Sequence, residues 1–441
     1  MTHLNTRTQP CGDAVQHVVG VPAFSADLFE HVLSAENMRS AWEHVRANKG
    51  AAGIDKMTIS EFPEWAKVNW TRVKAELWAG TYQPQPVRRV EIEKPDGGIR
   101  QLGIPTIPDR VIQQAIAQVL TPIFDPGFSA YSYGYRPKRS AADAVKQIQG
   151  DMKQGRRIVV DIDLSKFFDR VNHDRLMSLL GQKVDDKRLL ALIGRYLRAG
   201  VMVDKVIQPS RLGVPQGGPL SPLLANIMLD PWDKELERRG HKFARYADDI
   251  IIVVKSQRAG ERVLGSATRY LEDRLKLQVN TNKSRVVKPA KSKFLGFCFP
   301  QGRIQWHAKS LEKFRARVRE LTNRNWGVSM KYRLGQLGMF LRGWINYFGI
   351  ASGYQHCLEV DSWIRRRIRM CYWQQWRKPV TRIRNLIKRG VPEDLAVKCG
   401  ASQKGQWRSS KTAGIQLALS NDYLKAQGLY ELRLGWIALH H

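Results

Sequence analysis

Two short apolar segments that carry aspartates constrain the fold of this chain most. Residues 157–164 read RIVVDIDL, and residues 245–254 read RYADDIIIVV. Both segments have the composition of buried β-strands. The second predicts a hairpin with an aromatic strand, two acids at its tip and a buried returning strand. Unpaired carboxylates are costly in such surroundings, so Asp248 and Asp249 are expected to belong to a functional site.

A bare pair of aspartates means little by itself, and the chain contains a comparison. Asp185 and Asp186 lie in KVDDKRLL, a polar, helix-like stretch without flanking strands. We therefore expect a solvated turn at this second pair. The surrounding apolar strands are what distinguish Asp248 and Asp249.

Carboxylates at strand ends, in a cleft lined by cations, suit a site for two Mg²⁺ ions. Mg²⁺ prefers oxygen ligands, usually one or two carboxylates together with substrate phosphates. Two such ions can bind the attacking and leaving oxygens of a phosphoryl displacement. The candidate catalytic and metal-binding residues are Asp163, Asp248 and Asp249.

The charge of the chain indicates a polyanionic partner. It has 72 Lys and Arg against 40 Asp and Glu, a formal net charge of +32, and 43% hydrophobic residues. A composition this apolar excludes a disordered basic tail. No apolar run approaches the roughly 18 residues of a membrane span, and no secretion signal is evident. Five scattered cysteines without a C-x-x-C pair fit a reducing compartment. We expect a cytoplasmic protein that binds nucleic acid and no membrane.

The last third of the chain differs in composition from the rest. Residues 301–441 hold 26 Lys and Arg against 8 Asp and Glu, and 8 of the 13 tryptophans. The change falls near residues 296–306. In residues 363–376, helical spacing places Ile364 and Ile368 on one face and arginines on the opposite face. These arginines are Arg365, Arg366 and Arg369. The pattern predicts an α+β core followed by a basic helical part.

Three motifs, in the right order, resemble those of reverse transcriptases. Residues 246–249 (YADD) resemble the Y-x-D-D signature, and Asp163 with Phe168 and Asp169 resembles the first catalytic motif. Between them, residues 213–222 (GVPQGGPLSP) resemble the P-Q-G segment. The resemblance implies a right-hand polymerase fold with fingers, a palm with an antiparallel sheet, and a thumb. It also implies RNA-directed DNA polymerase activity.

The same resemblance implies a dNTP site. Residues 94–100 (KPDGGIR) resemble the fingers hairpin, in which Lys94 and Arg100 would bind the triphosphate; the alternative is two surface cations. Gln216 would shape the nucleotide pocket. Lys283 could protonate the leaving pyrophosphate, or could be a solvated lysine.

Phe168 has two possible roles, one at the nucleotide site and one in the core. In the family, an aromatic residue at this position excludes the ribose 2′-OH, so that dNTPs are preferred over rNTPs. The alternative is a core phenylalanine, which we expect Phe167 to be. We call the exclusion of the 2′-OH by Phe168 the gate hypothesis. The Phe168 side chain would point the same way as that of Asp163 only if the chain has already turned after the strand that ends near Asp163.

The C-terminal part resembles group II intron reverse transcriptases. Residues 341–348 (LRGWINYF) and 363–369 (WIRRRIR) resemble their maturase, thumb or X domain. Residues 404–408 and 418–421 resemble the DNA-binding domain, and residues 48–55 the segment ahead of the fingers. No H-N-H endonuclease motif follows, so the resemblance is to the endonuclease-lacking, bacterial class C-like branch.

The resemblance predicts four regions. They are 1–85, an N-terminal extension and the start of the fingers; 86–300, fingers and palm; 301–380, the thumb or maturase domain; and 381–441, a small basic DNA-binding domain.

The function implied is that of an intron-encoded enzyme. The protein would bind its group II intron RNA through Arg365, Arg366 and Arg369, assist splicing, and copy the intron into cDNA during retrohoming. It would use an RNA template, a DNA primer or target DNA, dNTPs and two Mg²⁺ ions, and would associate with the nucleoid when inserting. Two alternatives stay open: a splicing-only RNA-binding protein on an inactive polymerase fold, and a domesticated reverse transcriptase in phage defence or CRISPR adaptation.

Overall fold

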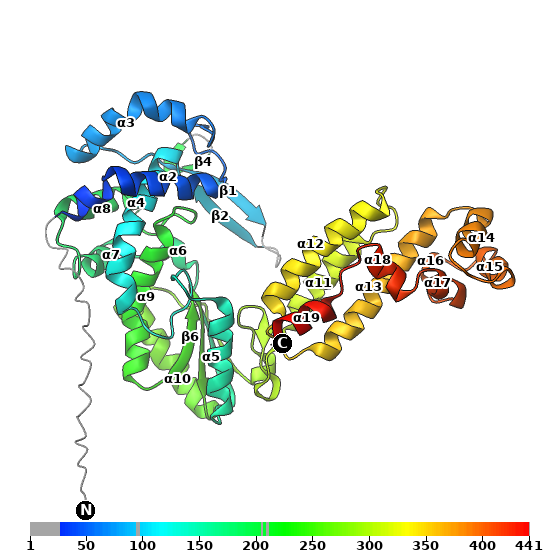
Figure 1. Ribbon diagram of the computed structural model, residues 1–441. Coiled ribbons are helices and arrows are strands. Elements are labelled where there is room, and N and C mark those ends of the chain that lie inside the picture. The colour runs from blue at the N-terminus through cyan, green and yellow to red at the C-terminus, as the bar shows by residue number, and fades with distance from the viewer. Residues whose placement is uncertain (1–26, 94–97, 204–205, 209–210, 441) are drawn as a thin grey trace, which may run out of the picture.

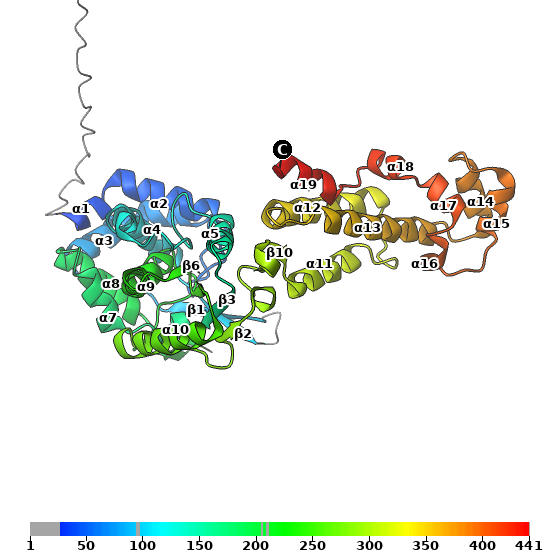
Figure 2. The ribbon, with the colours of Figure 1, turned by 90° about the horizontal axis from the view of Figure 1, so that it is seen from below.

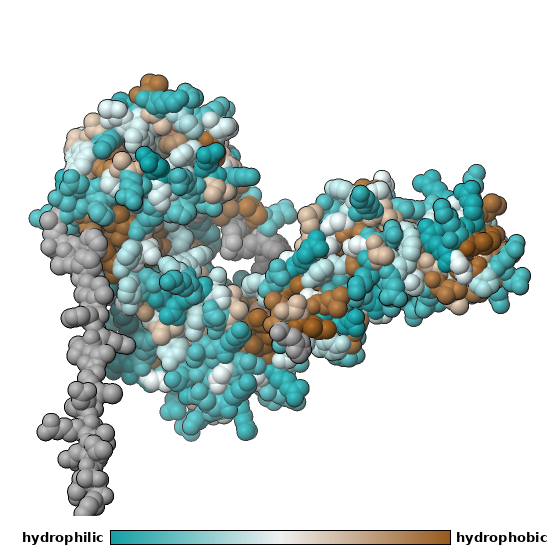
Figure 3. Space-filling view, in the orientation of Figure 1, coloured by the Kyte–Doolittle hydropathy of each residue, from teal (hydrophilic) through white to brown (hydrophobic). Residues whose placement is uncertain are grey.

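The chain forms two lobes, a mixed α/β lobe and an elongated helical lobe, which are joined near residues 290–306 (Figures 1 and 2). The computed structural model describes residues 27–93, 98–203, 206–208 and 211–440. Figure 3 shows an open gap between the two lobes beside their junction. No helix of the described part of the chain has the length and apolar character needed to cross a membrane.

The N-terminal helices and a four-stranded sheet form one end of the mixed lobe. The first two helices are separate, because Ser34 accepts a hydrogen bond from the Asn37 backbone and caps a new helix. The helices are α1 (Leu28–Val32), α2 (Ala35–Ala47), α3 (Phe62–Trp78) and α4 (Ile107–Phe124). The sheet has the order β2-β1-β4-β5, with β1 (Val87–Glu93), β2 (Ile99–Ile104), β4 (Val201–Val203) and β5 (Val206–Gln208).

A second four-stranded sheet forms the centre of the mixed lobe and carries both acidic segments. Its order is β6-β7-β3-β8, and all neighbours are antiparallel. The strands are β3 (Ile158–Asp163), β6 (Lys242–Tyr246), β7 (Asp249–Val254) and β8 (Arg285–Val287). The two strands expected from the apolar runs are therefore present, and they are direct neighbours.

The two faces of this central sheet are buried by different helices. Val160, Ile250 and Ile252 belong to the largest core cluster, together with side chains of α9 (Ser221–Arg238) and α10 (Gln257–Arg269). Val159 and Val253 face the other way and pack with α5 (Ala141–Lys153). Because side chains alternate along a strand, Asp161, Asp163 and Asp249 share the α5 face. Figure 2 shows α9 and α5 on opposite sides of the strands.

Short helices complete the mixed lobe and correct one expectation. They are α6 (Phe167–Arg170), α7 (His173–Leu180), α8 (Lys187–Arg198), the 3₁₀ turns Asp125–Gly127, Pro289–Lys291 and Pro300–Gly302, and the π-helical turn Tyr270–Arg274. The solvated turn expected at Asp185 and Asp186 is wrong for the second residue. Asp186 caps α8 by accepting hydrogen bonds from the backbones of Arg188 and Leu189, and its other oxygen accepts one from Phe29.

The helical lobe is attached through a small hairpin. Trp306, in the hairpin of β9 (Phe297–Cys298) and β10 (Gln305–Trp306), donates from Nε1 to the Phe348 carbonyl at 2.9 Å. The Tyr347 hydroxyl donates to the Leu295 carbonyl at 3.1 Å. The long helices are α11 (Ala308–Leu321), α12 (Met330–Phe348) and α13 (Tyr354–Gln375). The remaining helices are α14 (Pro379–Ile387), α15 (Glu393–Gly400), α16 (Gln406–Ser409), α17 (Ala413–Ala418), α18 (Asn421–Ala426) and α19 (Leu432–His440).

Candidate active site

The Tyr246–Asp249 segment forms a tight turn between two paired strands. Tyr246 and Asp249 are opposite each other in the ladder, which leaves Ala247 and Asp248 as a two-residue loop. Ala247 has a φ of 59°, the left-handed conformation that such tight hairpin turns require. Gly134 lies against this turn, and a Cβ there would come within 2.3 Å of the Ala247 nitrogen. Only a residue without a side chain permits this close approach.

Sheet register brings Asp163 beside Asp249. The two residues are directly opposite each other at the ends of β3 and β7. Such cross-strand pairs have Cβ atoms roughly 4.5–5.5 Å apart, and like charges there repel. On its other side, Asp163 donates its backbone N–H to Ser284 Oγ at 3.0 Å and accepts from the Asn280 backbone at 2.8 Å. The three predicted catalytic residues therefore meet at one end of the sheet.

The carboxylates repel one another without a cation between them. Burial, followed by the charges of Asp161 and Asp248, raises the pKa of Asp249 to about 7. The Leu295 backbone N–H donates a hydrogen bond to the Asp249 carboxylate and opposes this shift. Burial also raises the pKa of Asp161 to about 6, although Arg285 lies 3.6 Å from its carboxylate. Removing this repulsion is what a bound divalent cation would achieve.

The donor set fits Mg²⁺ in its chemistry. Asp163, Asp248 and Asp249 offer only oxygen ligands, and Mg²⁺ usually takes one or two carboxylates, several waters and substrate phosphates. Among the described residues, no group of three or more His, Cys, Asp or Glu side chains is arranged as a ready-made metal site. Both the oxygen-only donor set and the lack of a ready-made ligand group among the described residues agree with an open carboxylate cluster. Such a cluster would rely on substrate phosphates for the remaining metal ligands.

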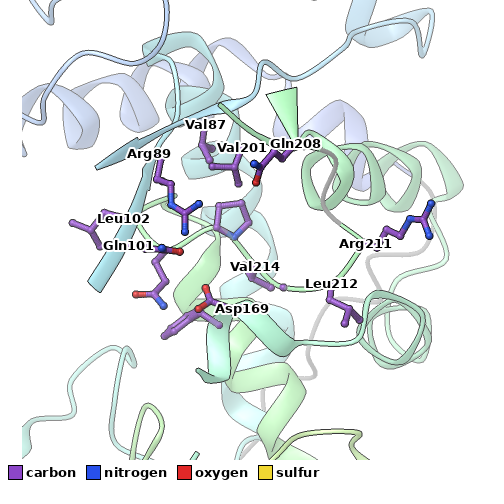
Figure 4. A pocket seen from close by; sticks show the side chains of 15 residues that line it. Val87, Arg89, Gln101, Leu102, Asp169, Val201, Gln208, Arg211, Leu212 and Val214 are labelled. Carbon is purple, nitrogen blue, oxygen red and sulfur yellow. The ribbon is translucent and has the colours of Figure 1, made fainter. Parts of the chain in front are cut away.

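A hollow of about 260 Å³ lies between the two sheets' connecting segments, and Asp169 is the one acidic residue of its described lining (Figure 4). It is lined by β1, β2, α6 and the loop of residues 211–216, and both Phe168 and Gln216 belong to its lining. The loop is tied to β2, since the Gln216 carbonyl accepts from the Gly103 backbone at 2.7 Å. It is also tied to α6, since the Phe168 carbonyl accepts from the Val214 backbone at 2.6 Å. Two of the predicted nucleotide-binding residues are thus brought together.

The chain turns between Asp163 and Phe168 as the gate hypothesis requires. β3 ends at Asp163, Lys166 has a φ of 48°, and α6 begins at Phe167. Phe167 is buried at 2% exposure, as expected for a core residue. Phe168 is only half-buried and lines the hollow. This placement is compatible with contact to a nucleotide sugar.

The structure places two of the three cations that were predicted to bind the nucleotide. Lys283 is exposed and lies in the turn whose Asn280 backbone bonds to Asp163. Arg100 lies on β2 opposite Ile92, and Lys94 falls outside the described residues. Their roles stay predictions.

Sequence reasoning missed two other cations, one in the hollow and one near the carboxylates. Arg89 of β1 extends into the hollow in Figure 4, and its buried Nε has no hydrogen-bond partner among the described residues. Lys293 acts on the pKa values of both Asp161 and Asp249. Neither residue belongs to a motif with distinctive spacing, so the sequence offered no signal for them.

A buried ion pair, also missed by sequence reasoning, supports the turn of residues 246–249. Arg245 and Asp233 are both 0% exposed, with Nε 2.8 Å from Oδ1 and Nη2 2.5 Å from Oδ2. Arg245 Nη1 donates to the Ala247 carbonyl at 3.0 Å and to Asn226 Oδ1 at 2.9 Å. Nη2 also donates to Ser132 Oγ at 2.7 Å. A buried charge is tolerated only when it is paired and hydrogen-bonded, and here the pair also holds the two-residue loop of Ala247 and Asp248. We call this network the Arg245 clamp.

The arginines of α13 are placed differently from the expectation. Ile364 and Ile368 are buried as predicted, at 1% and 0% exposure. The opposite face is covered by the C-terminal segments instead of being free. Arg365 pairs with Glu431 at 3.2 Å, the Arg366 guanidinium lies 3.6 Å from the Trp407 ring centroid, and Arg369 donates to the Leu419 carbonyl at 2.9 Å. The arginine-bearing face of α13 is therefore not a free basic surface. Direct phosphate contact by these three side chains stays a prediction.

Comparisons with known proteins identify the family. Residues 92–299 match the family model described as reverse transcriptase (RNA-dependent DNA polymerase), and residues 311–390 match the group II intron, maturase-specific domain. Protein YkfC of Escherichia coli (strain K12) is 32% identical over 299 residues, which cover 59% of this chain and 78% of YkfC. The chain belongs to the group II intron-encoded reverse transcriptases.

Two further relatives of this family are similar over the same share of the chain. Group II intron-encoded protein LtrA of Lactococcus lactis subsp. cremoris is 35% identical over 263 residues, covering 59% of this chain and 42% of LtrA. The putative COX1/OXI3 intron 2 protein of Saccharomyces cerevisiae is 30% identical over 321 residues, covering 58% of this chain and 37% of that protein. The chain therefore spans less than half the length of these two relatives.

The family, the α+β polymerase fold with a helical C-terminal part, and the reverse transcriptase and maturase functions predicted from the sequence are confirmed. The domain boundaries and the assignment to an endonuclease-lacking branch stay predictions.

Proposed function

We propose that this reverse transcriptase copies the group II intron RNA that it binds into cDNA during retrohoming, and that it assists splicing of the same RNA. The observation that carries the proposal is the pairing of Asp163 with Asp249, with Asp248 in the adjoining turn. A hollow lined by Phe168 and Gln216 supports it. A maturase-specific domain in the same chain supplies the link to intron RNA. Its substrates are an RNA template, a DNA primer or target DNA, and dNTPs.

The chemistry proposed at this end of the palm is nucleotidyl transfer. Asp163, Asp248 and Asp249 would hold two Mg²⁺ ions, which would supply charge stabilisation to the reacting oxygens. The surrounding chain fixes the carboxylates in place. Ser284 holds the end of β3, the Leu295 N–H holds the Asp249 carboxylate, and the Arg245 clamp holds the turn.

Separate residues handle the nucleotide. The bond that forms joins the primer 3′-oxygen to the α-phosphate of a dNTP, and pyrophosphate leaves. Phe168 packs against the sugar and leaves no room for a 2′-OH, while Gln216 and the backbone of its loop position the nucleotide. Lys94 and Arg100 bind the triphosphate, and Lys283 provides a proton to the pyrophosphate. Positioning of this kind accounts for most of catalysis in phosphoryl transfer.

The exposed cations of both lobes bring the protein to RNA. The formal charge of +32 favours association with a polyanion and makes affinity fall steeply with salt. The proposed place of action is the bacterial cytoplasm, at the nucleoid during insertion. The splicing-only and domesticated alternatives are not favoured, since the acidic residues and the maturase-specific domain occur together.

The test separates the two activities in one protein. The wild-type chain is expected to extend a DNA primer on an RNA template with dNTPs and Mg²⁺, and to accelerate splicing of a transcript of the intron that contains its reading frame. Asp163→Asn should abolish extension and leave splicing nearly unchanged, because splicing requires RNA binding and not the carboxylates. Failure of the wild-type chain to extend the primer would contradict the polymerase, and failure to accelerate splicing would contradict the maturase.

A further inference from the structure

We infer that a basic hollow at the far end of the palm sheet binds backbone phosphates of the intron RNA, at a place separate from the polymerase site. The inference rests on the proposed function and names a surface for its RNA partner. The hollow has a volume of about 710 Å³ and lies between α10, the start of β6 and the end of β7. Among the described residues, six cations line it and Glu261 is the one acidic lining residue; the cations are Arg156, Arg239, Lys242, Lys255, Arg262 and Arg269.

Three of the six cations are available for a ligand. Within the described ranges of the chain, Lys255, Arg262 and Arg269 have no acidic partner within 4 Å, and all three are exposed. The others have partners within the chain. Arg239 pairs with Glu235 at 2.7 Å, Lys242 donates to the Tyr131 hydroxyl at 3.2 Å, and Arg156 donates to Gln154 Oε1 at 2.9 Å. The hollow therefore has an uncompensated positive charge, which favours a bound polyanion.

The basic hollow is remote from the catalytic carboxylates. Lys255 is six residues beyond Asp249 along β7, a distance of roughly 20 Å at the rise of a strand. α10 covers the sheet face that carries Val160 and Ile252, whereas Asp163 and Asp249 are on the opposite face. Figure 1 also shows α10 on the part of the mixed lobe away from α13 to α15. The hollow is therefore a surface separate from the carboxylate cluster.

The spacing of the cations suits a chain of phosphates better than a single anion. Arg262 and Arg269 are seven residues apart on one face of α10, which corresponds to roughly 10 Å along the helix. One strand of a duplex presents a phosphate about every 3.4 Å of its axis, so this span covers several successive phosphates. Between the arginines the lining residues are the buried Val263 and the small Gly265 and Ser266, and a Cβ at Gly265 would meet no atom within 4 Å. A nucleic acid backbone can therefore approach the helix closely.

The experiment compares two triple variants in which the same number of positive charges is removed. The first is Lys255→Gln with Arg262→Gln and Arg269→Gln; the control is Lys74→Gln with Lys146→Gln and Lys153→Gln, three exposed lysines on α3 and α5. Binding to a transcript of the intron that contains the reading frame is measured at several salt concentrations. The slope of log affinity against log salt falls by roughly 0.7–0.9 for each phosphate that a variant no longer neutralises. We expect the slope of the first variant to fall by about two units and that of the control to fall much less.

Primer extension on a saturating primer–template provides the second readout. It should stay at the wild-type rate in the first variant, which also shows that the variant is folded. An unchanged slope in the first variant, or a reduction equal to that of the control, would overturn the inference. So would a parallel loss of primer extension, because the hollow would then hold the template. The wild-type chain is measured first. If it does not bind the transcript, both the proposed maturase function and this inference fail. If it binds normally and the first variant has an unchanged slope, only the inference about the hollow fails.

Discussion

The acidic residues of the palm and the arginines of α13 were predicted by the same kind of reasoning, with different outcomes. In both regions, charged residues were placed relative to apolar periodicity. In the palm, Asp163 and Asp249 lie opposite each other at the end of two paired strands. In α13 the apolar face is buried as expected, but Arg366 and Arg369 contact residues of the C-terminal segments.

The difference has a structural cause. A strand has two neighbours whose register is fixed by hydrogen bonds, so an aspartate at its end has a defined partner across the ladder. A helical pattern reveals which face meets the first neighbour and says nothing of a second one. Any later segment of the chain can cover the opposite face, as α16 and α19 do here. Strand patterns therefore predict which charged residues lie close together better than helical patterns do.

The largest expected effect tests the palm side of this comparison. Asp248→Asn keeps the shape of the side chain and removes a charged ligand, which corresponds to several kcal/mol of transition-state stabilisation and roughly a 10³-fold loss of rate. Steady-state primer extension on RNA should show this loss, with intron RNA binding retained. The control is Asp185→Asn, an exposed aspartate of the other Asp-Asp pair, which should be fully active. Near-normal extension by Asp248→Asn would remove this residue from the site.

A second variant tests how strongly the buried Arg245 clamp stabilises the mixed lobe, compared with an exposed ion pair of the helical lobe. Asp233→Asn leaves the Arg245 guanidinium buried without its counter-charge, which typically costs about 3–5 kcal/mol of unfolding free energy. Urea denaturation measures this quantity. Arg317→Gln breaks an exposed ion pair with Glu320 in the helical lobe and should cost less than about 1 kcal/mol. Equal effects of the two variants would contradict the contrast between the lobes.

The gate at Phe168 predicts a change of selectivity and not of stability. Phe168→Val should open space beside the sugar and raise incorporation of rNTPs relative to dNTPs by roughly 10–100-fold, the range of about 1–3 kcal/mol for a change of apolar packing around a substrate. Single-nucleotide incorporation kinetics measure the ratio. Phe167→Leu is the matched control: it alters the core, so stability should fall while sugar selectivity stays. If both variants select sugars like the wild type, Phe168 is a structural residue.

The pKa of Asp249 predicts that this residue destabilises the metal-free protein. The folded value is about 7, whereas an unfolded aspartate titrates near 4. Between these values the folded state holds a proton that the unfolded chain has released, so the unfolding free energy falls as pH rises from about 4 to 7. Asp249→Asn should then be more stable than wild type by about 1–2 kcal/mol at pH 8, after allowance for partial solvent exposure.

Urea unfolding in EDTA at pH 8 and at lower pH provides the measurement. The advantage of Asp249→Asn should shrink as the pH approaches 4. Asp161, whose pKa is about 6, titrates in the same range, so the curve reports the pair. A variant no more stable than wild type at pH 8 would show that the carboxylates do not repel one another as described.

The smallest expected effect lies in the helical lobe. Arg366→Gln removes the packing of the guanidinium on the Trp407 ring and a hydrogen bond to the Trp407 carbonyl at 3.0 Å, which should lower the unfolding free energy by about 1–2 kcal/mol. The salt slope for intron RNA should stay unchanged, because this guanidinium is already occupied. Arg377→Gln, at an exposed position just beyond α13, should change neither stability nor slope. A slope reduced by roughly 0.7–0.9 in Arg366→Gln would restore the predicted phosphate contact.

The sequence by itself determined the strands, their acidic ends and the order of the motifs. These features depend on local alternation, because successive strand residues point to opposite faces whatever the rest of the chain does. The same locality placed Ile364 and Ile368 in the core and predicted the hairpin of residues 245–254. Its tip differs from the prediction, because Ala247 and Asp248 form the loop and Asp249 already belongs to β7. The family followed from motifs that are each continuous in the sequence.

Only the tertiary structure decided which distant residues meet. The Asp186 side chain accepts a hydrogen bond from Phe29, 157 positions away, and Arg245 reaches Ser132 across 113 positions. Neither contact leaves a periodic signal, because it depends on where two separate elements are packed against each other. The same holds for the covered arginines of α13 and for the basic hollow beside α10, whose cations come from segments that touch only in the folded chain.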